Sequence, residues 1–207
     1  MDVCGLFPLI VQVCVVLLAG LWYLISELFT KRWRRAAVIL SAMVLTIIAS
    51  PKLYDLYQIR NIFGTWVFLP DPTVVYESER TFHGDGYTIV VYELPKSLQR
   101  RFELADASSL REFPSRPWFR SEWETRPWTQ GPAGADLEPF IDFAVPRYQD
   151  GPAYLPRIFE KIRVALTKPT TFYSFHYKAH EKDYPSNIDF FVIDLEKRQM
   201  YIINHNT

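Results

Sequence analysis

The sequence has very little cysteine and no excess of charge of either sign. Two of its 207 residues are cysteines, Cys4 and Cys14, and both lie in the first apolar run. Residues 54–207 therefore hold no cysteine, which excludes disulfide bonds within this part and any site of the Cys-x-x-Cys type. The 23 Lys and Arg residues equal the 23 Asp and Glu residues in number, so the net positive charge typical of a nucleic-acid-binding domain is missing.

Charge is nevertheless divided unevenly along the chain. Residues 1–53 hold five of the 23 bases and two of the 23 acids, which leaves 18 bases and 21 acids for residues 54–207. The second part is therefore mildly acidic, and we expect no nucleic acid among its partners.

The first part consists largely of apolar sequence. No charged residue occurs from Val3 to Ser26, and a second uncharged run extends from Ala36 to Pro51. A helix rises about 1.5 Å per residue, so the first run can cross a hydrocarbon core about 30 Å thick. A soluble helix would show a polar stripe, and a cleaved signal peptide would begin with basic residues. We therefore predict an uncleaved transmembrane helical hairpin, residues 1–53, in contact with membrane lipid.

The loop between the two runs, "KRWRR" at 31–35, has four bases in five positions. Short loops rich in Lys and Arg stay on the cytoplasmic side of a membrane. We therefore expect the chain in a bacterial inner membrane with its C-terminal part in the periplasm. The reverse orientation stays open, because Lys52 and Arg60 lie beyond the second run.

The rest of the chain predicts a juxtamembrane connector, residues 54–72, followed by an α+β domain, residues 73–207. Strands followed by a helix and further strands favour a small, mainly antiparallel sheet with helices on one face. The expected elements are strands at 73–79 and 87–94, helices near 95–104 and 154–168, and three strands within 170–206.

The segment 113–134 contains four prolines and three tryptophans without a clean period, and we expect a long irregular excursion there. Exposed Trp and Arg are typical binding anchors. The alternative is a loop folded back so that its tryptophans cover the core, and both interpretations stay open. The candidate binding residues are Trp118, Arg120, Trp123, Arg126 and Trp128.

The stretch His83-Gly84-Asp85-Gly86 directly precedes a run of β-formers. His83 could move a proton and Asp85 could orient it, which makes them weak catalytic candidates. The simpler interpretation is a turn in which the glycines adopt positive φ, and we favour it because no nucleophile or second acid accompanies the pair.

Four histidines could bind a metal, namely His83, His176, His180 and His205. His176 and His180 are four residues apart, but their segment is expected to be extended, which separates them by about 13 Å. We predict no metal and no cofactor.

Two stretches at the ends of this domain resemble a pattern found in small bacterial proteins that carry a membrane or lipoprotein anchor. Those proteins pair an "FHGDG" turn and strand with a closing strand hairpin of the form Asn, apolar run, Asp, polar turn, Tyr. The matching positions are Phe82 to Gly86, Asn187, Ile193, Asp194 and Tyr201. The resemblance implies a topology and brings no activity.

These observations favour a membrane-tethered, non-catalytic protein-binding module over an enzyme. Its expected partner is another protein, such as an envelope component or a toxin, and in the second case the chain would be an immunity protein. Two alternatives are an envelope hydrolase that uses His83 and Asp85, and a structural subunit of a membrane complex that acts through the hairpin.

Overall fold

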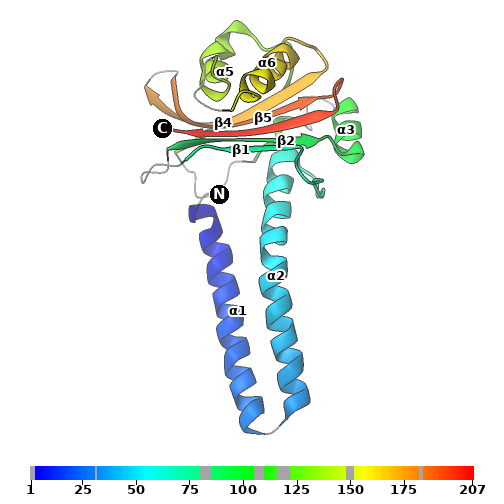
Figure 1. Ribbon diagram of the computed structural model, residues 1–207, viewed down its shortest axis with the longest axis vertical. Coiled ribbons are helices and arrows are strands. Elements are labelled where there is room, and N and C mark those ends of the chain that lie inside the picture. The colour runs from blue at the N-terminus through cyan, green and yellow to red at the C-terminus, as the bar shows by residue number, and fades with distance from the viewer. Residues whose placement is uncertain are drawn as a thin grey trace. The chain divides into compact units, whose positions relative to one another are not determined.

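The computed structural model describes residues 3–30, 32–79, 85–104, 110–115, 122–147, 152–181 and 184–207 (Figure 1). The chain divides into two compact units, Met1–Arg60 and Asn61–Thr207. Each unit is described by itself below.

The first unit contains two long helices, α1 (Val3–Phe29) and α2 (Trp33–Phe63). Among the described residues, α2 is the one helix that is both long and apolar enough to cross a membrane, and the apolar segment Cys14–Glu27 of α1 is shorter. The side chains of α2 are largely exposed, and they include apolar ones on every side, such as Leu40, Ile48 and Leu53. A helix of this kind lacks the polar stripe of a soluble surface helix.

Close contacts join α1 to α2. A Cβ added to Gly20 would lie 2.9 Å from the sulfur of Met43, so the helices approach closely at this glycine. At the turn between them, the Glu27 carboxylate lies 3.9 Å from the Arg35 guanidinium. These contacts define a helical hairpin, and its passage through a membrane stays a prediction.

The second helix continues beyond the predicted end of the hairpin and passes through Pro51. A proline inside a helix leaves the carbonyl four residues earlier without its usual donor. Here the Ser50 hydroxyl donates to the carbonyl of Ile47 at 3.1 Å, which supplies that missing bond. As a result, the first part of the predicted connector 54–72 is helical up to Phe63.

The second unit is built on a six-stranded sheet in which all neighbouring strands are antiparallel. The strand order is β1-β2-β6-β5-β4-β3. The strands are β1 (Val74–Glu77), β2 (Gly86–Glu93), β3 (Glu124–Gln130), β4 (Thr171–Glu181), β5 (Tyr184–Asp194) and β6 (Gln199–Asn206). This confirms the predicted α+β class and the mainly antiparallel sheet.

Helices cover both faces of the sheet, so the prediction of helices on one face was wrong. One face packs against α5 (Glu138–Ala144), which follows the short helix η1 (Ala135–Leu137), and against α6 (Leu155–Leu166) (Figure 1). The other face packs against α3 (Lys96–Glu103) through Phe102, whose ring lies 5.1 Å from that of Phe172.

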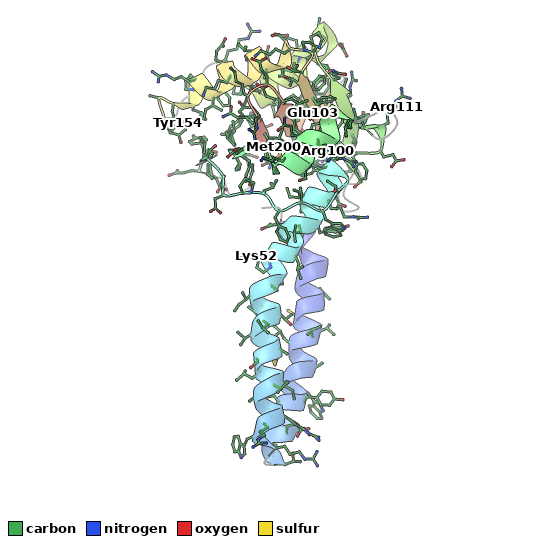
Figure 2. All side chains as sticks on the ribbon, turned by 90° about the vertical axis from the view of Figure 1, so that its right-hand side faces the viewer. Lys52, Arg100, Glu103, Arg111, Tyr154 and Met200 are labelled. Atoms are coloured by element: carbon green, nitrogen blue, oxygen red, sulfur yellow. The ribbon has the colours of Figure 1, made fainter. Side chains whose placement is uncertain are left out.

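The strands account for this arrangement because they are apolar on both sides. In β5, Phe190 and Val192 join the core under α5 and α6, whereas Phe191 and Ile193 are buried on the opposite face. An antiparallel strand with one wet face would alternate apolar and polar residues. The exposed side of α3 carries Arg100 and Glu103 (Figure 2).

Strand β3 lies inside the segment 113–134 that was expected to be irregular, so that expectation was wrong for 124–130. Its Pro127 hides the strand in the sequence, because proline cannot donate to a ladder and occurs in sheets at edges and bulges. Both conditions hold here. β3 is an edge strand, and its register with β4 shifts between Arg126 and Thr129.

The bulge turns Trp128 to the opposite face from Arg126. A shift of one residue moves the following side chains to the other side of a sheet. Arg126 lies on the α5 side, where it pairs with Asp136 at 2.9 Å. Trp128 lies on the α3 side, where its ring stacks on Phe63 at 5.5 Å and its indole N–H donates to the carbonyl of Ile62 at 2.8 Å.

We predict that Trp128→Ala lowers the free energy of unfolding by about 3–5 kcal/mol, because it removes a large buried ring and leaves a cavity. Urea unfolding of the detergent-solubilised chain, followed by near-UV circular dichroism, measures this. The matched control is Trp66→Ala, at a side chain that is 63% exposed, which should change stability by about 0.5 kcal/mol or less. Equal effects of the two substitutions would contradict the buried position of Trp128.

Candidate functional site

One line of polar side chains crosses the whole sheet on the α3 side. Its members occupy directly opposed positions, one from each strand, and therefore share a face. In strand order they are Glu77, Thr88, Asn204, Asp189, His176 and Thr125. We call this set the polar row.

The polar row is held by hydrogen bonds between neighbouring strands. The Asn204 amide donates to the Asp189 carboxylate at 2.5 Å, and Thr125 Oγ1 shares a hydrogen bond with His176 Nδ1 at 2.9 Å. His176 is 3% exposed, and its ring meets that of Phe191 edge to face at 5.9 Å. Buried polar groups need such partners, because unpaired ones cost free energy.

A second polar line lies beside the first, towards the end of the sheet. It is formed by Lys178, Asn187 and Asn206, which are opposed in register, and it ends at Gly86 in β2. Lys178 donates to Glu122 at 2.7 Å. The Asn206 side-chain oxygen is buried and has no hydrogen-bond partner in the part of the chain that the structure describes. Gly86 and Asn187, which carry the family resemblance, are thus brought to the same end of the sheet.

The polar row places a hydroxyl, an imidazole and a carboxylate side by side, as in a nucleophile with its base and orienting acid. The histidine is buried, however, and a general base must reach the proton that it removes. The arrangement therefore suits recognition of polar groups at the half-buried Asp189, Asn204 and Thr88 better than catalysis at His176.

The candidate catalytic pair is only partly placed. Asp85 is half-buried directly before β2, whereas His83 lies outside the described residues. Their catalytic role stays a prediction.

The candidate binding residues do not form one surface among those the structure describes. Arg126 is exposed, Trp123 is half-buried before β3, and Trp128 is 4% exposed. Trp128 is therefore a core residue, in agreement with the alternative in which tryptophans cover the core. Trp118 and Arg120 lie outside the described residues.

Two of the four histidines can be compared as metal ligands. His176 belongs to the polar row, whereas His205 lies on the opposite face, where its ring stacks on Phe143 at 4.2 Å. His83 and the His180 side chain are not described. Among the described residues, no group of three His, Cys, Asp or Glu side chains could hold a metal ion.

Asp194 and Tyr201, which also carry the resemblance, line a hollow of about 330 Å³ beside α6. Asp194 is 2% exposed and accepts a hydrogen bond from the backbone N–H of Lys197 at 2.9 Å, which closes the turn between β5 and β6. Burial, and then the charge of Asp194, raise the pKa of the Tyr201 hydroxyl to about 12. The "Asp, polar turn, Tyr" pattern is thus explained by the hairpin itself.

The polar row could not be found in the sequence, because its members come from segments more than 120 residues apart and only strand pairing aligns them.

Comparisons with known proteins give no indication of the function of this site. No family model, no curated protein and no solved structure matches this chain.

We predict that the chain loses stability as the pH falls below 6.5, partly through His205. Burial lowers the pKa of this imidazole from its ordinary 6.5, although a hydrogen bond between Nδ1 and the carbonyl of Phe143 opposes the shift. Well above pH 6.5 the His205 imidazole is neutral in both the folded and the unfolded chain. Below it, the unfolded chain takes up a proton before the folded chain does, and this favours unfolding until the pH passes the folded pKa.

Urea midpoints of the wild type and of His205→Gln, measured between pH 4.5 and 7.5, check this prediction. The wild-type curve should fall more steeply than that of the variant, whose side chain cannot be protonated. Parallel curves would show that His205 does not contribute.

Proposed function

We propose that the protein is a membrane-tethered, non-catalytic protein-binding module of the bacterial inner membrane. The α1–α2 hairpin is its anchor, and the α+β domain is the part that binds. The single observation that carries the proposal is the character of α2, which is apolar, 31 residues long and largely uncovered.

The exposed apolar side chains of α2 need a covering. Burial of apolar surface stabilises by about 25 cal/mol per Å², so a helix that exposes valine, leucine and isoleucine along its length is unfavourable in water. A bilayer satisfies this surface without further protein. A helix of 31 residues is about 46 Å long, which exceeds the roughly 30 Å of a hydrocarbon core.

The orientation follows from the turn between α1 and α2. Arg32 in this turn and Arg34 and Arg35 in the first turn of α2 are exposed. Basic residues in a short loop favour its retention in the cytoplasm, which supports a periplasmic α+β domain.

Binding is favoured over catalysis by the nature of the polar residues. In the polar row, His176 is buried, whereas the side-chain amide of Asn204 and the carboxylate of Asp189 are half-buried. A partner protein is the ligand that fits a mildly acidic domain fixed at a membrane. If that partner is a toxin that enters the envelope, the protein acts as an immunity protein.

We expect alkaline phosphatase fused after Thr207 to be active, and a fluorescent protein at the same position to be dark. The phosphatase folds only in the oxidising periplasm, whereas the fluorescent protein matures in the cytoplasm. Fluorescence without phosphatase activity would overturn the proposed orientation.

We also expect cross-linked membranes to yield a protein that co-purifies with the wild type and is depleted with Trp118→Ala/Trp123→Ala. Trp128 is left intact in this variant, because its truncation would damage the core. The matched control, Trp66→Ala, should retain the partner. If the same proteins co-purify with the wild type and with the double variant, binding does not occur through Trp118 and Trp123.

A further inference from the structure

The two edges of the sheet differ in how they are protected against pairing with another strand. Native proteins blunt edge strands with proline, bulges and charged side chains. β3 has all three, since Pro127 lies at a bulge and Glu124 and Arg126 flank it. Further pairing at this edge is therefore disfavoured.

The opposite edge, β1, has neither a proline nor a bulge, and its one charged side chain is Glu77 at its end. Its sequence is Val-Val-Tyr-Glu, its register with β2 is regular, and Val75 is 56% exposed. In the parts of the chain that the structure describes, no strand pairs with the outer side of β1. Valine and tyrosine are strand formers, so this edge is suited to accept another strand.

The hydrogen-bond pattern shows which residue faces outward. The backbone N–H of Ser78 donates to the carbonyl of Tyr87 at 2.8 Å. Inward and outward residues alternate along an antiparallel pair, so Tyr76 faces β2 while the N–H and carbonyl of Val75 point to the open edge.

The edge is complementary to a second copy of itself. If two β1 strands pair antiparallel about Val75, this residue lies opposite its own copy and Val74 lies opposite Tyr76. Glu77 then lies opposite Thr73, so no like charges meet. Thr73 precedes the strand and its backbone N–H donates to the carbonyl of Val91 at 2.8 Å, so the pairing across the edge is centred on Val75. A two-fold axis through Val75 generates this register.

The two-fold axis also determines how the faces of the two sheets are arranged. The axis is perpendicular to the sheet, so it keeps the α3 face of both copies on the same side. On this face the ring of Phe63 contacts Phe102 and Trp128 in each copy.

We propose that β1 is a homodimer interface, through which two copies join their sheets into one of twelve strands. Because β1 has four residues, the pairing makes few hydrogen bonds and needs a high local concentration. Confinement to a membrane supplies it, and this step alone rests on the proposed function.

Disulfide cross-linking tests both the pairing and its register. In a full-length Cys4→Ser/Cys14→Ser background, Val75→Cys should form a disulfide-linked dimer in native membranes. Residues opposed in a hydrogen-bonded pair have Cα atoms about 5.5 Å apart, within the range that a disulfide spans.

Glu77→Cys is the matched control, because its two copies would be about 14 Å apart along the strands. We expect about tenfold less dimer from this variant alone.

Dimer yields from Val75→Cys no higher than those from Glu77→Cys would overturn the proposal, as would cross-links from Val75→Cys to a different protein. Either result can be distinguished from a failure of the hairpin to anchor the chain in a membrane. The fusions after Thr207 and the fractionation of the chain with membranes report on the anchor independently.

Discussion

The hydrogen bond from the Trp128 indole to the carbonyl of Ile62 fixes where the α+β domain begins. The last carbonyl groups of a helix have no partner within the helix and need donors from elsewhere. In this protein one donor comes from an edge strand, and the ring that carries it stacks on Phe63 and meets Phe102 at 4.9 Å. The end of α2 is thus part of the core, together with α3 and β3.

The bulge in β3 makes this arrangement possible. In a regular strand, Trp128 would share a face with Arg126 and would point towards α5. The extra residue at Pro127 sends the charged side chain to one face and the indole to the other. The segment 113–134 thus has the composition of a loop but contributes β3 and Trp128 to the core. This composition is why the sequence predicted an irregular excursion there.

The elements that the sequence predicted well are those with a clear local signal. β-Branched and aromatic residues on either side of a glycine-bearing segment predicted β1 and β2, and the i, i+3, i+4 spacing of Leu155, Ile158 and Phe159 predicted α6. The second covered face could not be predicted, because strands that are apolar on both sides do not reveal which helices lie over them. The polar row escaped for a related reason. Thr88 and Asn204 become neighbours only through strand pairing, which no local pattern encodes.

The buried position of Phe63 also limits how this domain can be separated from the helical hairpin. A protease that cuts α2 before Asn61 would release the domain with its aromatic core complete. A cut after Gly64 would remove the ring on which Trp128 stacks and the carbonyl to which it donates, and the released piece would be damaged. Shedding of an intact domain therefore requires cleavage within a helix, where the backbone is least open to proteases.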